Sequence, residues 1–182
     1  MENNYQRVTR IIGSVFPIDF SHVSDEVLEN AQDFGNAVHK MVELYIKETL
    51  DFTTLDDKLK PYLEQFKKWL KDSKFKPKGV SHRIYSEKYK FTGELDLWGT
   101  EKGVLTIPDL KTTTVIPKTV GLQLSGYEIL LREHLKTQAK INRRVLRLFP
   151  DKYEYLPMTR KSDMSAFLAC MLITNYRKEI GL

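Results

Sequence analysis

Apolar side chains recur every three or four residues in four stretches of the chain, the spacing that gathers them on one face of a helix. The predicted helices span residues 25–50, 57–73, 117–135 and 162–180. Ser24 and Ser162 stand where N-terminal capping residues are expected, and Pro61 fits the first turn of the second helix.

Shorter runs rich in β-branched and aromatic residues, bounded by turn residues, predict five strands. They span residues 81–91, 93–99, 103–113, 141–149 and 152–158. The segment "FKPKG", residues 75–79, interrupts the pattern before the first of them. The predicted order is therefore ααβββαββα, an α/β domain with helices packed on a mixed sheet.

Length and composition agree with one ordinary domain. The 182 residues are 41% hydrophobic, which is enough to bury a core, and no low-complexity linker divides them. The chain has no apolar run of about 18 residues and no signal-peptide layout at its start, so we expect a cytoplasmic protein that does not span a membrane. Its single cysteine, Cys170, lies in the apolar run "FLACMLI" and is predicted to be a buried hydrophobe.

The chain carries a net charge of +5 and a pI near 9.1, which permits a polyanionic partner without requiring one. Six basic residues are candidates for a phosphate-contacting rim, and the alternative is that these surface charges are simply solvated. The six residues are Lys88, Lys90, Lys118, Arg143, Arg144 and Arg147.

Two acidic residues and a lysine stand inside predicted strands, in "GELDLWGTEKGVLTIPDLK". Side chains alternate along a strand, so Asp109 and Lys111 should share a face, as should Glu94, Asp96 and Trp98 on the preceding strand. Strands disfavour Asp, so these positions call for an explanation.

The turn "GTEKG" sets how the two strands pair. If Glu101 and Lys102 are its central residues, Glu94 faces Asp109 and Asp96 lies diagonal to it, so that the carboxylates of Asp96 and Asp109 can converge on one divalent cation. A register slip of one residue would place them on opposite faces.

The simpler alternative is a solvated strand face with a plain ion pair between Asp109 and Lys111. Two features weigh against it. Strands disfavour Asp, and Asp109 follows Pro108, which cannot donate to a sheet ladder. The segment thus breaks the rules for strands where its charges fall, and such places tend to be functional sites.

Four short motifs occur in order along the chain: "GNAVH" (35–39), "GELD" (93–96), "DLK" (109–111) and "QLSGY" (123–127). They fall on a predicted helix, two strands and a helix. In this order they resemble the PD-(D/E)XK nuclease superfamily in its RecB-type branch. The opening "YQRVTRIIGSVF" also resembles phage-borne members. Some members of the branch carry a four-cysteine iron–sulfur cluster, which a single cysteine excludes here.

The resemblance implies a restriction-endonuclease-like core over residues 1–182 and a site for Mg²⁺ or Mn²⁺. It implies that His39, Asp96, Asp109 and the carbonyl of Leu110 hold the metal. Carboxylate oxygens suit both ions, and an imidazole favours Mn²⁺.

Lys111 would then orient the attacking water and stabilise charge on the scissile phosphate. Gln123 and Tyr127 share a helix face and would reach the active site or the DNA strand, with Tyr127 stacking on a base. The alternative for this pair is a core tyrosine beside a solvated glutamine. Glu87 is a further acid that could support the site, whereas His22, His82 and His134 match no motif.

The leading hypothesis is a metal-dependent deoxyribonuclease acting on DNA, an exonuclease of recombination, repair or phage DNA processing, with a recombination or replication protein as a further partner. One alternative is a DNA-binding module with this fold and no turnover. Another is a structural α/β domain in which the four motifs are coincidental. Sequence leaves the polarity of cleavage, the number of metals and the oligomeric state open.

Overall fold

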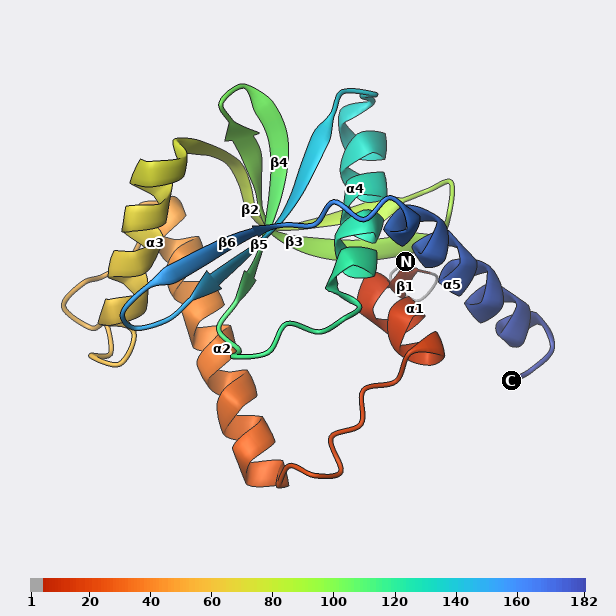
Figure 1. Ribbon diagram of the computed structural model, residues 1–182, viewed down its shortest axis with the longest axis horizontal. Coiled ribbons are helices and arrows are strands. Elements are labelled where there is room, and N and C mark those ends of the chain that lie inside the picture. Colours follow the sequence, from red (N-terminus) through yellow and green to blue (C-terminus); the bar gives the residue numbers. More distant parts are fainter. Residues whose placement is uncertain (1–4) are drawn as a thin grey trace.

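Helices cover both faces of one mixed sheet in the computed structural model, which describes residues 5–182 (Figure 1). The helices are α1 (Val8–Val15), α2 (Asp25–Ile46), α3 (Lys60–Ser73), α4 (Val120–Leu135) and α5 (Ser162–Glu179). The strands are β1 (Gln6–Arg7), β2 (Phe75–Ser86), β3 (Phe91–Glu101), β4 (Val104–Lys111), β5 (Ile141–Leu148) and β6 (Tyr153–Pro157).

Within the described residues the sheet has six strands in the order β1-β3-β4-β5-β6, and β2 pairs with β3. β2, β3 and β4 form an antiparallel meander, β4 and β5 are parallel, and β5 and β6 are antiparallel. The parallel step from β4 to β5 needs a crossover, and α4 provides it. A mixed sheet with helices on both faces confirms the predicted fold class.

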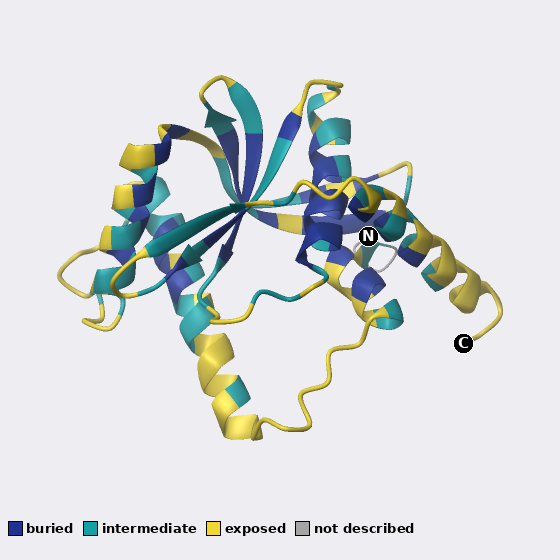
Figure 2. Cartoon of the chain, in the orientation of Figure 1, coloured by how far each residue is buried: buried dark blue, intermediate teal, exposed yellow. Residues whose placement is uncertain are grey.

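The sheet separates two hydrophobic clusters, one under each layer of helices (Figure 2). α1, α4 and α5 cover one face, where Phe91 and Phe167 are fully buried. α2 and α3 cover the other, where Phe66 and Trp69 are fully buried. Burying each such side chain stabilises the fold by about 1.5–3 kcal/mol, so both layers are tied to the strands between them.

The predicted order of elements is confirmed from α2 onward, although two elements before it were missed and several bounds differ. The helix predicted over residues 25–50, for example, ends at Ile46. β1 and α1 were not predicted, because eight helical residues give too short a pattern. β2 begins at Phe75 and ends at Ser86, and residues 87–90 form a turn, so the predicted strand 81–91 was wrong at both ends. Ser24 caps α2 by accepting from the Val27 N–H, whereas Ser162 lies inside α5 and caps nothing.

The hairpin between β3 and β4 turns on Lys102 and Gly103, both at positive φ (50° and 83°). Two successive residues at positive φ form the tight turn that best matches the twist of a hairpin. Pairing therefore runs Glu101 with Val104 and Gly99 with Thr106, two residues away from the register first considered.

The backbone pairing between β3 and β4 ends at Thr106, while β4 stays paired with β5 as far as Lys111. Beyond Thr106 the two strands diverge, and a gap opens in the plane of the sheet. Pro108 lies within this stretch. The N–H of Leu110 points toward β3, and by the alternation of a strand the amide of Pro108 has the same direction. Its missing N–H therefore leaves no unpaired donor in the gap.

A kink in β2 and β3 accompanies this gap. Ser81 has φ of 45° and lies opposite Asp96 between regular pairs on either side. Leu95 packs with Trp98 in the cluster under α4, while Leu97 packs in the cluster under α2 and α3. Strict alternation would place Leu95 with Leu97 and Asp96 with Trp98, so the predicted common face of Glu94, Asp96 and Trp98 is wrong.

The first turns of α2 project from the body and are largely exposed, as is the connection from α1 that precedes them (Figure 2). Within residues 5–182, no helix combines the length and the apolar character that a membrane crossing requires.

Candidate active site

The carboxylate of Asp96 lies in the gap between β3 and β4. Its Oδ2 accepts a hydrogen bond from the backbone N–H of Leu110 at 2.8 Å. This side-chain bond replaces the ladder bond that β4 loses when it leaves β3, and an unsatisfied N–H there would cost about 1–3 kcal/mol. Asp96 therefore has a structural role in addition to any chemistry.

Asp109 is nearly inaccessible (1% exposed) and is the centre of a second set of contacts. Lys111 Nζ lies 2.8 Å from its Oδ2, so the predicted common face of these two residues is confirmed. Gln123 Nε2 on α4 donates to Asp109 Oδ1 at 2.9 Å and to the hydroxyl of Tyr127 at 3.0 Å. The "DLK" and "QLSGY" motifs are thus joined by direct contacts.

His39 approaches from α2 on the opposite side of the sheet. Its Nδ1 lies 3.0 Å from Asp96 Oδ1, and about one third of its side chain is exposed. Gln123 and Tyr127 reach the site from α4, so the two motif helices meet it from different layers. Asp96 faces α2 and Asp109 faces α4, and their carboxylates approach each other through the gap. The prediction that they share one face of the sheet was therefore wrong.

Opposite charges set the pKa values in this group. Burial alone would lower the pKa of His39 and that of Lys111, but nearby carboxylates outweigh it and raise both. Burial alone would raise the pKa of Asp96, yet His39, Lys111 and the Leu110 N–H together lower it. At Asp109 burial prevails, and the charge of Asp96 adds to it, so its pKa is raised. Asp109 is thus the carboxylate whose negative charge is least compensated.

The donor atoms fit a hard divalent cation. Asp109 Oδ2 is at ion-pair distance from Lys111 but lacks a hydrogen-bond partner of good geometry among the described residues. The carbonyl of Leu110 shares the strand edge of its N–H and so faces the gap beside Asp96. Mg²⁺ is commonly held by one or two carboxylates together with water and substrate phosphate.

Residues 5–182 contain no ready group of three His, Cys, Asp or Glu side chains arranged around a metal position. His39 contacts Asp96, whereas Asp109 is engaged by Lys111 and Gln123. The site's fit to a divalent cation therefore depends on the carboxylates of Asp96 and Asp109 and the carbonyl of Leu110. His39 already contacts Asp96 through Nδ1 and so orients its carboxylate. A histidine held by a carboxylate in this way has its other nitrogen, Nε2, left for a metal.

The two motif glycines play different roles. A Cβ at Gly93 would lie 2.7 Å from the Tyr127 ring and 2.9 Å from Leu130, so only glycine lets α4 pack this closely on β3. A Cβ at Gly35 would meet only Thr112 Oγ1, at an ordinary 3.6 Å. Among the described residues, Gly35 therefore makes no close approach to another backbone that would require a glycine.

Tyr127 presents its hydroxyl to the site and buries its ring. It is 6% exposed and packs in the cluster under α4. Burial and the nearby carboxylates raise the pKa of its hydroxyl, which keeps the phenol neutral. A buried ring has no free face for a base, so the predicted stacking role was wrong.

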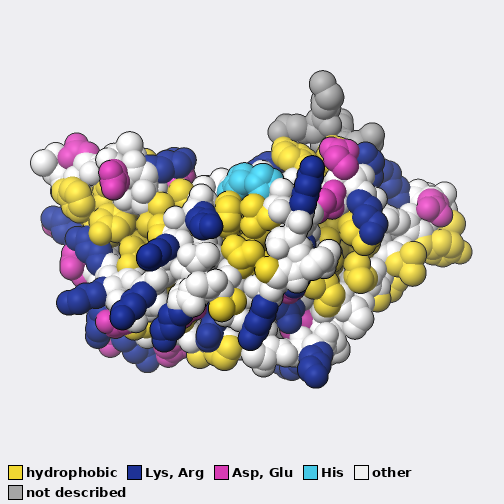
Figure 3. All heavy atoms as spheres, turned by 90° about the horizontal axis from the view of Figure 1, so that it is seen from above, with side chains coloured by type: hydrophobic (Ala, Val, Ile, Leu, Met, Phe, Trp, Pro, Cys, Tyr) yellow, Lys and Arg dark blue, Asp and Glu magenta, His cyan; other side chains and the backbone are white. Residues whose placement is uncertain are grey.

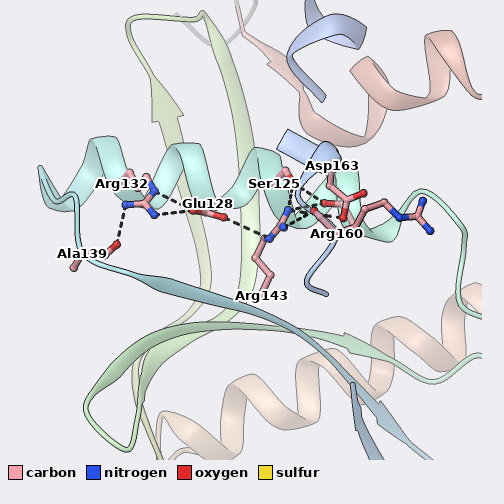
Figure 4. Close-up of polar contacts among 8 residues, drawn as sticks. Ser125, Glu128, Arg132, Ala139, Arg143, Arg160 and Asp163 are labelled. Carbon is pink, nitrogen blue, oxygen red and sulfur yellow. Dashed lines mark hydrogen bonds and ion pairs between the residues drawn. The ribbon is translucent and has the colours of Figure 1, made fainter. Parts of the chain in front are cut away.

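Most arginines of the predicted phosphate rim are structural. Arg143 bonds Ser125 and lies 3.5 Å from Glu128 and 4.0 Å from Asp163, in a polar network between α4, β5 and α5 (Figure 4). Its side chain is only 10% exposed. Arg144 lies over the ring of Tyr155. Arg143 thus stabilises the packing of α4 and α5 on β5, whereas Arg144 joins β5 to β6, and neither presents a charged rim.

Arg147 has a role that the sequence did not reveal. It pairs with Glu154 at 2.6 Å and donates to the carbonyls of Thr113 and Thr114. These carbonyls lie just after Lys111, so Arg147 fastens the loop that leaves the site. An arginine at this position in a strand carries no distinguishing pattern in a single sequence.

The lysines of the predicted rim remain at the surface. Lys88, Lys90 and Lys118 are exposed, although Lys90 pairs with Glu87 at 2.9 Å. Glu87 lies on the turn before β3 and also accepts a hydrogen bond from the Tyr5 hydroxyl. Among the described residues, its side-chain contacts are therefore with this turn and Tyr5, and not with the site. Lys and Arg outnumber Asp and Glu on the face that carries the β3–β4 turn (Figure 3).

Comparisons with known proteins support the fold. No protein-family model matches the chain, and no curated protein matches it in sequence. A crystal structure from Eubacterium rectale, named "Putative exonuclease", is similar with a TM-score of 0.62 at 12% identity, over 96% of this chain and 79% of that chain. The structure of SSO0001 gives a TM-score of 0.47 at 11% identity over 96% and 78% of the two chains. The first likeness shows a shared fold, consistent with a restriction-endonuclease-like core.

The glycine contacts predict opposite effects of two alanine substitutions. Gly93→Ala should lower the free energy of unfolding by about 1–3 kcal/mol, because its methyl overlaps the Tyr127 ring. Gly35→Ala should raise it by about 0.5–1 kcal/mol, because a helix gains from losing a glycine. Urea unfolding measures both. Combining Gly93→Ala with Tyr127→Leu should cost less than the sum of the two single changes, and strict additivity would contradict the proposed overlap.

The raised pKa of His39 predicts a pH-dependent contribution to stability. A raised pKa means that the contribution is fully present below the ordinary value of 6.5 and is lost as pH rises through the raised value. The stability difference between wild type and His39→Gln should therefore shrink from about pH 5.5 to about pH 8.5 in EDTA. His22→Gln, which removes an exposed histidine, is the control. A difference that grows with pH would refute the His39–Asp96 pairing.

Proposed function

We propose that the chain is a metal-dependent deoxyribonuclease of the PD-(D/E)XK superfamily, in its RecB-type branch, formed as a single domain over residues 1–182. One observation carries the proposal. Side chains from all four motifs converge on the gap between β3 and β4, through His39–Asp96, Asp96–Leu110, Asp109–Lys111 and Asp109–Gln123 contacts. Chance resemblance in sequence gives no reason for such convergence.

Asp96, Asp109 and the carbonyl of Leu110 would hold Mg²⁺ or Mn²⁺, with His39 as a further ligand. When bound, the metal ion supplies Lewis acidity, which polarises a phosphate oxygen and makes nearby water more acidic. The raised pKa of Asp109 supports this assignment, because an added cation would relieve the uncompensated charge there.

Lys111 acts as a fixed positive charge. Its pKa is raised, so it stays protonated at neutral pH and cannot serve as a general base in this arrangement. A buried ammonium next to the scissile phosphate stabilises the negative charge that develops on the phosphate as water attacks and the bond to the leaving oxygen breaks. Gln123 holds Asp109 in place through one of its N–H groups, and Tyr127 in turn positions Gln123.

We assign the activity to the exonuclease class, acting on DNA ends in recombination, repair or phage DNA processing inside the cytoplasm. A recombination or replication protein is the expected further partner. The name of the Eubacterium rectale protein supports this class, as does the resemblance to a branch rich in enzymes that process ends.

Removal of the Asp109 charge tests the site. Asp109→Asn should lower cleavage by orders of magnitude while binding of DNA in EDTA persists, because a neutral amide binds a hard cation poorly. Asp151→Asn is the matched control. Asp151 is exposed in the turn between β5 and β6, away from the site, so this variant should cleave at a near-normal rate.

Gel assays with end-labelled DNA, together with circular dichroism to confirm folding, give the readout. Normal cleavage by a folded Asp109→Asn protein would remove Asp109 from the site. A wild-type protein that binds DNA and never cleaves it would favour the alternative of a DNA-binding module.

The exonuclease assignment predicts a strong dependence on free ends. Linear DNA should be degraded much faster than a covalently closed circle of the same sequence, because the enzyme must begin at an end. A time course on both substrates in one tube makes the comparison direct. Equal rates would indicate an endonuclease.

A further inference from the structure

A strongly basic hollow of about 740 Å³ lies between α1 and the C-terminal turns of α5, which pack side by side (Figure 1). Arg7 and Arg10 line it from the start of the chain, and Arg177 and Lys178 line it from the last helix. The helices are joined there, because Arg177 donates to the carbonyl of Ser14 at 2.6 Å. The hollow is separate from the carboxylate site described above.

The four cations of this hollow are exposed. Among residues 5–182, the lining of the hollow includes no Asp or Glu side chain. Within residues 5–182, no carboxylate forms an ion pair with Arg7, Arg10, Arg177 or Lys178. The arginines of the sheet and of α4 are instead held by acids or aromatic rings. Four unpaired positive charges around one hollow create a local potential that attracts a polyanion.

A second, smaller hollow lies between this surface and Tyr127, a neighbour of the active site. It measures about 220 Å³, shares Arg7 with the basic hollow, and is also lined by Gly93, Glu94 and Tyr127. Tyr127 contacts Gln123, which contacts Asp109. Glu94 is the one acid that lines this smaller hollow, and its charge is balanced by Arg83.

We propose that the basic hollow binds backbone phosphates of the DNA strand whose scissile bond lies at Lys111. The proposal rests on the nuclease function and adds a second contact region for the same substrate. Arg7, Arg10, Arg177 and Lys178 neutralise phosphates on the side of Tyr127 away from Lys111. Tyr5 lines the same hollow, with its ring held against Tyr85 and Lys90. The hollow thereby holds the strand in register without reading its sequence.

The test is binding of a labelled single-stranded oligonucleotide in EDTA, followed by fluorescence anisotropy over a range of salt concentrations. The variant is Arg10→Gln with Lys178→Gln, which spares Arg177 and its contact between helices. The matched control is Lys58→Gln with Lys68→Gln, which removes the same charge from exposed positions in and before α3.

Each lost phosphate contact lowers the slope of log K against log salt by about 0.7 for a single strand. The hollow variant should therefore lose about 1.4 in slope, which corresponds to roughly 25-fold weaker binding at about 0.1 M salt. The control should retain the wild-type slope. Equal losses in both variants would show an effect of net charge alone and would overturn the proposal, as would no loss in either.

Two further arms distinguish DNA binding from lipid binding and from a failure of the nuclease function. The wild-type protein and the Arg10→Gln, Lys178→Gln variant should bind equally to vesicles of phosphatidylserine and phosphatidylcholine. Dependence on these residues for vesicles but not for DNA would reassign the hollow to a lipid surface. The binding comparison is made in EDTA, which prevents metal-dependent turnover, so it does not require an active enzyme. If the wild-type protein fails to cleave DNA in a separate assay with metal, the nuclease function is removed and the binding comparison still stands.

Discussion

The divergence of β4 from β3 after Thr106 is the constraint on which the site depends. Two carboxylates and a lysine could not be placed inside a regular sheet, because ladder bonds and cross-strand packing would exclude them. By leaving β3 while remaining paired with β5, β4 opens a gap that both helix layers can reach. Asp96 repairs the ladder by binding the Leu110 N–H, and Pro108 removes a donor that would have had no partner. The fold thereby accommodates the charged group with few unpaired backbone polar atoms.

Charge balance within the gap accounts for how these charged residues are held together and suits the chemistry proposed for them. The two negative charges of Asp96 and Asp109 are balanced by the positive charges of Lys111 and protonated His39. Burial makes any imbalance costly, and the imbalance falls on Asp109. A group of this kind is held together by its opposite charges and is also prepared to accept a further cation. The same residues can thus serve the folded protein and its proposed chemistry, while the phosphate-binding hollow proposed at α1 and α5 extends the positive surface to the rest of a strand.

Periodicity was sufficient to predict every element from α2 to α5, because these segments repeat apolar residues over long enough windows. Four motifs in order predicted the candidate site residues, and the structure shows contacts among them. The register of the hairpin was wrong, because the sequence allows two turns and only the positive φ of Lys102 selects one. The kink at Ser81 and the burial of Tyr127, Arg143 and Arg147 depend on contacts between distant segments. No local pattern encodes such contacts, and charged residues in particular look alike whether they are solvated or buried.

The central claim is that the group around Asp96, Asp109 and Lys111 hydrolyses DNA with a divalent cation. The most direct measurement is the rate at which purified wild-type protein releases nucleotides from labelled linear DNA in Mg²⁺, in Mn²⁺ and in EDTA. The account predicts release with both metals, none in EDTA, and recovery when metal is added in excess of the chelator. Release that continues unchanged in EDTA, or none with either metal from a folded protein that binds DNA, would contradict it.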